Sequence, residues 1–242
     1  MVGFFILTKK IKNLVAPATF AKDRAFIDVI FSPKEAYFNA DGTLNSIKVI
    51  QTLKENGILN LFFKKPLDIS ITFKTRGEPQ FFVKIMSDLL QNVGYYKYVT
   101  SDSSLNNLEF SWKIGLTSEY APDPLIINQE LKKNSCEIVD IIRDNSTDWT
   151  YIIDMKHAKL SVPILENSGE FRLKRSLYAS WIDVSKIGSL KIESSVRNDW
   201  FPYIASYDKN LNLLKVIKLN TKKTELTMNI EEGTRYLKIS DM

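Results

Sequence analysis

Three helix-forming segments of the chain end with the same four-residue pattern, Leu-x-x-Asn, and each is followed by two strand-like segments. The pattern ends at Asn56, Asn92 and Asn134. Asparagine is common at helix ends because it tolerates the left-handed backbone conformation, so one instance carries little information. Three instances at the same place in a helix–strand–strand order predict a repeated unit. Because a lone hairpin is marginally stable in water, we expect each unit to pack against its neighbours.

The first unit shows this order most clearly. Its helix is expected over residues 43–57, with apolar side chains at helical spacing: Leu44, Ile47, Ile50 and Leu53. Two strands are expected after it, at 58–63 and 67–75, separated by Lys64-Lys65-Pro66. In the second of these strands, Ile69, Ile71 and Phe73 alternate with polar residues and therefore share one face.

The other two units repeat the same order. Their helices are expected at 81–92 and 124–134, and their strands at 94–100, 108–115, 136–142 and 148–155. A strand at 26–31 is expected to begin the sheet. We therefore predict an α+β domain over residues 21–156, built from helix–hairpin (αββ) repeats with an antiparallel sheet, and preceded by an N-terminal segment, 1–20.

From His157 onward the helical periodicity disappears. Short alternating runs separated by turn residues take its place, at 171–173, 179–184, 190–193, 203–207, 214–219, 226–230 and 236–239. Short strands at this spacing are typical of two-sheet β folds. Residues 157–242 are therefore predicted to form an all-β sandwich or jelly-roll domain.

Several strand-core runs of this domain are similar to a known class of module. They are Trp181-Ile182-Asp183-Val184, Leu190-Lys191-Ile192, residues 200–208 and residues 233–240. On these residues the last third of the chain resembles small β-sandwich domains of the carbohydrate-binding-module type. The resemblance implies a sandwich fold of the kind found as an accessory on bacterial and phage surface proteins.

Two runs of the N-terminal domain carry a second resemblance. They are Asp123-Pro124-Leu125-Ile126 and residues 137–143. In these runs the domain resembles uncharacterised periplasmic proteins of Gram-negative bacteria. The resemblance implies a place in the bacterial envelope and assigns no role to any residue.

The candidate ligand site is a polar loop that runs into aromatic residues at the edge of the predicted sandwich. It consists of Arg197, Asn198, Asp199, Trp200 and Tyr203. Sugar rings stack on tryptophan and tyrosine, while polar side chains bond their hydroxyl groups. The competing interpretation is a plain loop followed by aromatic residues that face the core. Alternation also puts Tyr203, Ala205 and Tyr207 on one face of a strand.

Residues that could support catalysis or bind a metal are few. His157 is the only histidine, which excludes sites with several histidine ligands, and it lies at the predicted domain junction. Cys136 is the only cysteine, which excludes an intrachain disulfide and a cysteine-rich zinc site. It is expected to be a small half-buried core residue rather than a nucleophile. No glycine-rich phosphate loop occurs.

Two runs rich in aspartate and asparagine have oxygen side chains of the kind that bind calcium. They are residues 39–42 and residues 208–212, and the second lacks the bidentate acid of a complete calcium loop. Turns stabilised by Asp and Asn side chains explain both runs without a metal. We therefore expect no cofactor and no metal, while an active site made of carboxylates alone stays open.

The charge of the chain is weakly basic. The net charge is +5, the pI is about 9.0, and the lysines come as scattered doublets among acids. This pattern is typical of solvated surface rather than of a nucleic-acid stripe. The first ten residues, an apolar run followed by lysines, can be a strand, a peripheral anchor or the remnant of a signal segment. No run approaches the ~20 apolar residues of a transmembrane helix.

These observations favour a non-enzymatic binding or scaffold protein of the bacterial envelope, periplasmic or secreted, with a cytoplasmic location left open. Its β-sandwich would bind a glycan or a protein, and its repeats would offer a protein-interaction surface. The alternative is a nucleic-acid-binding protein that uses the helix–hairpin repeats, because such units recur in RNA-binding folds. The oligomeric state is left open.

Overall fold

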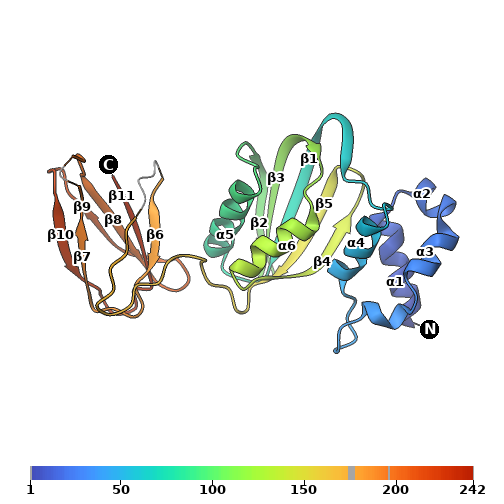
Figure 1. The fold of residues 1–242 in the computed structure, drawn as a ribbon, viewed down its shortest axis with the longest axis horizontal. Coiled ribbons are helices and arrows are strands. Elements are labelled where there is room, and N and C mark those ends of the chain that lie inside the picture. The colour runs from blue at the N-terminus through green and yellow to red at the C-terminus, as the bar shows by residue number, and fades with distance from the viewer. Residues whose placement is uncertain (1, 174–177, 196, 242) are drawn as a thin grey trace. The chain divides into compact units, whose positions relative to one another are not determined.

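A computed structural model describes residues 2–173, 178–195 and 197–241 of the 242-residue chain (Figure 1). The fold is α+β, and the chain divides into two compact units, Met1–Lys159 and Leu160–Met242. The division falls a few residues beyond the junction expected at 156–157. Residues 1–20, expected as a separate segment, belong to the first unit.

The first unit begins with short helices rather than strands. They are α1 Val2–Leu14, α2 Pro17–Lys22, α3 Arg24–Ile30 and the 3₁₀ helix η1 Lys34–Tyr37. The strand expected at 26–31 is therefore wrong, as is a strand at the N-terminus. The reason is visible in the burial, because Ile27 and Phe31 are both buried and are four residues apart. Residues four apart share a face in a helix and in a strand, but a strand would also bury Val29, which lies between them and is 69% exposed. Only a helix fits this burial.

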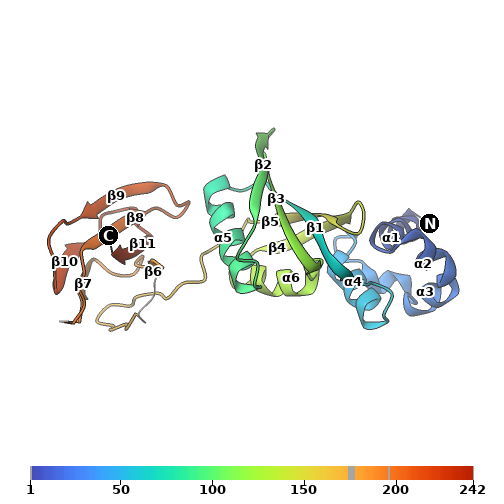
Figure 2. The same ribbon diagram turned by 90° about the horizontal axis from the view of Figure 1, so that it is seen from above.

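The remaining elements of this unit form a five-stranded mixed sheet with helices. In chain order they are α4 Ser46–Glu55, β1 Phe62–Thr75, α5 Pro79–Asn92, β2 Val99–Asn106, β3 Glu109–Tyr120, α6 Pro124–Lys133, β4 Glu137–Arg143 and β5 Asp148–Asp154. The strand order is β2-β3-β1-β5-β4, in which β1 is antiparallel to β3 but parallel to β5. The β2–β3 hairpin extends past its neighbours (Figure 2).

The helix–hairpin order holds after two of the three helices. A β2–β3 hairpin follows α5, and a β4–β5 hairpin follows α6. The strand expected at 94–100 is wrong in position, because β2 spans Val99–Asn106 and the chain turns only at Asn107 and Leu108, both of which have positive φ. After α4, however, the two expected strands are one long strand, β1, which runs through Lys64-Lys65-Pro66. The pairing of β1 with β3 shifts register between Phe62 and Leu67. Pro66 lies in this irregular stretch, so the strand tolerates a residue that has no N–H to donate to the neighbouring strand.

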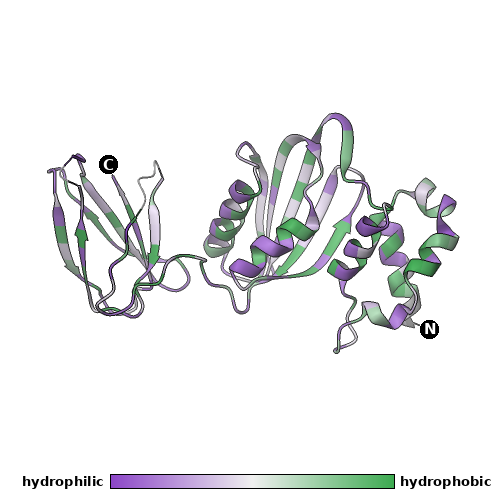
Figure 3. Ribbon diagram, in the orientation of Figure 1, coloured by the Kyte–Doolittle hydropathy of each residue, from purple (hydrophilic) through white to green (hydrophobic). Residues whose placement is uncertain are grey.

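The core of the first unit lies between the sheet and the helices on one of its faces. The central strands alternate, which Figure 3 shows as banding of hydrophobic and hydrophilic residues. Phe73 is fully buried, and its ring centroid is 6.0 Å from that of Trp112 and 5.7 Å from that of Tyr151. On the other face of β1 the side chains are polar, such as Ser70 and Thr72.

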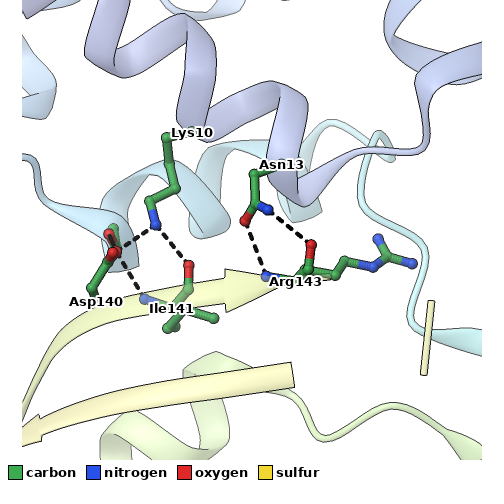
Figure 4. A network of polar contacts seen from close by, with 6 residues as sticks. Lys10, Asn13, Asp140, Ile141 and Arg143 are labelled. Atoms are coloured by element: carbon green, nitrogen blue, oxygen red, sulfur yellow. Dashed lines mark hydrogen bonds and ion pairs between the residues drawn. The ribbon is translucent and has the colours of Figure 1, made fainter. Parts of the chain in front are cut away.

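Helix α1 seals the outer edge of β4 (Figure 4). The ammonium group of Lys10 donates to the carbonyl of Ile141 at 2.7 Å. The side chain of Asn13 donates to the carbonyl of Arg143 at 2.9 Å and accepts from its amide at 3.0 Å. Lys10 also pairs with Asp140. These contacts satisfy backbone groups that an edge strand would otherwise offer to another chain.

The second unit consists of two antiparallel sheets. One has the order β6-β11-β8-β9, with β6 Ser180–Asp183, β8 Pro202–Tyr207, β9 Leu213–Lys218 and β11 Tyr236–Asp241. The other pairs β7 Ser189–Glu193 with β10 Glu225–Asn229. Their apolar sides share a core that includes Ile182, Ile204, Leu237, Leu190, Ile192, Leu226 and Met228. Residues 171–173, expected as a strand, are not one.

Candidate functional site

The expected ligand loop does not present its tryptophan to solvent. Trp200 is 5% exposed, belongs to the core of the second unit, and donates from its indole Nε1 to the carbonyl of Ser240 at 3.2 Å. Arg197, Asn198 and Asp199 lie on an exposed turn, whereas Tyr203 lies on β8. The structure therefore separates Trp200 from the other candidate residues, because its ring packs inward.

Aromatic side chains instead gather on the outer side of the four-stranded sheet. In the strand register, Lys238 of β11 lies opposite both Trp181 of β6 and Ala205 of β8. Residues opposite one another in adjacent strands share a face, so these three point away from the core residues Ile182 and Ile204. The same alternation along β8 puts Tyr203 and Tyr207 on this side. We call Trp181, Tyr203 and Tyr207 the aromatic face.

Two of the three rings of the aromatic face are neighbours. The centroids of the Trp181 and Tyr207 rings are 5.0 Å apart with their planes tilted by 33°. Ala205 lies between the two tyrosines along β8 and is only 1% exposed, so the larger neighbouring side chains cover it. The ammonium of Lys238 lies 5.9 Å from the Trp181 ring centroid. The surface thus combines half-buried rings with the ammonium group of Lys238 beside one of them.

The hydroxyl of Tyr207 stays neutral at physiological pH. Burial raises its pKa, and the nearby Tyr203 raises it further. A neutral phenol can both donate and accept a hydrogen bond. Tyr207 can therefore offer an apolar ring and a polar tip to the same ligand.

The other sheet of this unit has a polar outer side, as expected for a solvated antiparallel sheet. Lys191 pairs there with Glu193 at 2.6 Å and with Glu225 at 3.1 Å. By contrast, β9 extends the aromatic face with exposed Leu213 and Val216. An apolar and aromatic surface on one outer side only indicates an interaction site.

The sequence carried a signal for this face. In the run 179–184, Ile182 and Val184 are the core residues, so alternation assigns Trp181 to the opposite side. The shared face of Tyr203 and Tyr207 follows from the same rule. The sequence could not show that β6 and β8 lie on the two sides of β11 in the sheet, because strand neighbours in a sheet need not be neighbours in the chain.

The histidine and the cysteine of the chain lie in different surroundings. His157 is exposed in the turn after β5. Cys136 is 1% exposed, and burial raises the pKa of its thiol to about 12, with the negative charge of Asp154 adding to the effect. Among the residues that the structure describes, no group of three or more His, Cys, Asp or Glu side chains could hold a metal ion.

The two aspartate turns are held together by their own hydrogen bonds. The carboxylate of Asp41 accepts from the amide of Thr43 at 2.9 Å. The carboxylate of Asp208 accepts from the amides of Asn210 and Asn212, both at 2.8 Å. Each carboxylate therefore stabilises a turn, as such residues commonly do.

Cys136 is expected to resist alkylation in the folded protein. At pH 8 the ionised fraction of a thiol with a pKa of about 12 is roughly a thousandfold smaller than that of a thiol with the ordinary pKa of 9.0. The folded protein binds the thiol proton more tightly than the unfolded chain does. The contribution of this thiol to the free energy of unfolding is therefore fully present below pH 9 and is lost as the pH rises toward 12. Iodoacetamide labelling followed by mass spectrometry measures the rate, and unfolding in urea is the control. Equal rates in the folded and unfolded protein would contradict the burial of this thiol.

Comparison with known proteins found no match: no family model, no curated protein and no solved structure is similar to this chain. In the described parts of the chain, no helix is long and apolar enough to cross a membrane.

Proposed function

We propose that this chain is a non-enzymatic binding protein of the bacterial envelope, periplasmic or secreted, and that its C-terminal unit binds a glycan. In this proposal the two sheets of the C-terminal unit form a β-sandwich, and the aromatic face is the binding surface. The observation that carries the proposal is the position of Trp181, Tyr203 and Tyr207 on the solvent side of one sheet. The helix–hairpin units of the first unit act as a scaffold for protein contacts.

The chemistry of the aromatic face suits a sugar chain. A pyranose ring has an apolar face of C–H groups that stacks on an aromatic ring, and its hydroxyls need hydrogen-bonding partners. Trp181 and Tyr207 supply the rings, while Lys238 and the tyrosine hydroxyls supply the partners. The aromatic side chains lie on two strands, β6 and β8, on either side of β11, which favours an extended chain of sugars over a compact ligand. Arg197 and Asn198 lie just before β8 and can extend the site.

The first unit offers less support for the alternative of nucleic-acid binding. Single strands of RNA or DNA stack their bases on aromatic side chains. In the five-stranded sheet the rings of Phe73, Trp112 and Tyr151 are buried, so they are closed to bases. On the open face Lys74 is paired with Glu109 at 3.1 Å, so its charge is compensated. A salt-titrated binding assay with single-stranded RNA and DNA tests this alternative.

Removing the tryptophan of the aromatic face is expected to weaken glycan binding strongly. The test uses the full chain in affinity electrophoresis with soluble polysaccharides and in sedimentation with peptidoglycan sacculi, cellulose and chitin. Trp181→Ala should weaken binding by roughly tenfold to thirtyfold, the effect of losing a central aromatic contact. Trp181→Phe should retain part of the affinity because it keeps an aromatic ring.

Two controls make the result specific to the aromatic face. Lys191→Ala changes the polar outer side of the same unit and should leave binding unchanged. Circular dichroism should show that all variants keep the parent fold. The proposal fails if no glycan in the panel is retained, or if Trp181→Ala binds as tightly as the parent. Hydrolase or transferase turnover that is lost in His157→Ala would contradict the non-enzymatic function.

A further inference from the structure

The first unit contains a pocket remote from the edge that α1 seals. Its volume is about 480 Å³, within the range of roughly 300–1,000 Å³ that is usual for small-molecule sites. It lies where the end of α4, the start of β1, the end of β3 and the start of α6 meet. The residues that line it come from four separate stretches, at 54–62, 93–95, 118–123 and 126–127. All of these stretches belong to the first unit.

The walls of the pocket are mainly apolar and its rim is aromatic. The apolar lining residues are Leu59, Leu61, Val93, Ile126 and Ile127. At the rim, Phe62 and Tyr120 lie opposite each other in the β1–β3 pairing, with ring centroids 5.2 Å apart. Phe62 is 49% exposed and Tyr120 is 56% exposed. A large apolar pair held at the mouth of an apolar pocket can cover the ring system of a bound molecule.

The charges in the lining compensate each other. Lys54 forms an ion pair with Asp123, and both line the pocket. Asp123 also caps α6, where its carboxylate accepts from the amide of Leu125 at 3.0 Å. Neither charge is therefore left for an ionic ligand, and a ligand with its own charge would have to break this pair or remain unpaired in an apolar pocket.

Neutral hydroxyl groups are the remaining polar feature. Tyr95 and Ser118 both line the pocket, and Ser118 lies close enough to the Tyr95 hydroxyl to influence its pKa. Burial raises the pKa of Tyr95, so its hydroxyl keeps its proton at physiological pH. The hydroxyl of Ser118 accepts from the amide of Tyr120 at 3.1 Å. Because each hydroxyl has one donor and two acceptor positions, this bond leaves capacity for a ligand.

We propose that this pocket is a binding site for a neutral small molecule that has an apolar ring system and one hydrogen-bonding group. The apolar walls and the Phe62–Tyr120 pair take the ring system, and Tyr95 with Ser118 takes the polar group. The site is independent of the aromatic face, since it lies in the other unit and takes a single compact molecule rather than a sugar chain.

Three matched probes test this assignment by calorimetric titration of the full chain. They are 2-naphthol, naphthalene and 2-naphthoate, which share a ring system and differ in one group. We expect 2-naphthol to bind most tightly. Naphthalene should bind about fivefold more weakly because it lacks one hydrogen bond. The naphthoate should bind most weakly because the Lys54 ammonium in the lining is already paired with Asp123. Tyr95→Phe should remove most of the difference between 2-naphthol and naphthalene.

A filling variant shows whether the probes bind in this pocket. Val93→Trp places an indole in the lining and should weaken 2-naphthol binding at least about tenfold. Val139→Trp adds the same group to an exposed position on β4 and should have no effect. Thermal unfolding confirms that each variant is folded. The proposal is overturned if 2-naphthol does not bind saturably, if 2-naphthoate binds tightest, or if Val93→Trp and Val139→Trp bind alike.

Discussion

Replacing Phe73 by alanine is expected to destabilise the first unit by about 3–5 kcal/mol. Phe73 is fully buried at the centre of β1, and its ring contacts the rings of Trp112 and Tyr151 from the two neighbouring strands. Alanine would leave a cavity among three strands and would remove two aromatic contacts. Since folded domains are typically stable by roughly 5–15 kcal/mol, this loss is a large share of the total.

The measurement is urea unfolding of the full chain, followed by near-ultraviolet circular dichroism and calorimetry. The transition of the first unit should move to lower urea while that of the second unit stays in place, because the chain divides into two compact units. Phe62→Ala is the matched control. Phe62 is on the same strand but 49% exposed, so its loss should cost no more than about 1 kcal/mol. Equal effects of the two changes would contradict the core described above.

Replacing Asp140 by alanine is expected to cost about 2–3 kcal/mol, the second largest effect. One oxygen of the Asp140 carboxylate accepts from the hydroxyl of Ser46 at 2.6 Å and from the amide of Ile141 at 2.9 Å. The same carboxylate pairs with Lys10, whose side chain is only 10% exposed. Without it, Lys10 would keep a buried charge with no opposite charge beside it.

A double variant separates the loss of the pair from the exposure of a lone charge. Lys10→Met with Asp140→Leu removes both charges and should recover part of the stability lost in Asp140→Ala. Asp88→Ala breaks the Lys84–Asp88 pair on the surface of α5 and should cost at most about 0.5 kcal/mol. Urea unfolding measures all three. If Asp140→Ala costs no more than Asp88→Ala, the contacts between α1 and the edge of β4 do not contribute as proposed.

Much of the local structure of the first unit could be predicted from the sequence. The ends of α5 and α6 near Asn92 and Asn134 follow from apolar periodicity. This is a short-range effect, so a short stretch of sequence is enough to reveal it. The capping argument was wrong in detail, because the C-caps Val93 and Asn134 have φ of −89° and −96° and the left-handed residues are Gly94 and Ser135, which come after them. The prediction of a strand at 26–31 was wrong, because this stretch belongs mostly to α3. A short run whose apolar residues match both helical and strand spacing does not distinguish the two.

The candidate binding surfaces could be predicted less well. Alternation along β8 indicated the common face of Tyr203 and Tyr207. A separate argument, that a polar loop running into aromatic residues suits a sugar, gave Trp200 a place in the ligand site. A pattern of period two shows that a strand has two different faces. It does not show which face another sheet will cover, since covering depends on contacts between distant segments. Trp200 is in the core because the two sheets of the second unit meet on its side.

By itself, the sequence determined where α4, α5 and α6 form and that strands follow them, because hydrogen bonding and side-chain spacing act over a few residues. Only the tertiary structure decided that β1 is one strand with a parallel neighbour, that Trp181 lies beside Tyr207, and that Lys54 meets Asp123. These contacts join residues far apart in the chain. Their formation depends on how whole apolar faces are buried together, which is a property of the assembled fold rather than of any one segment.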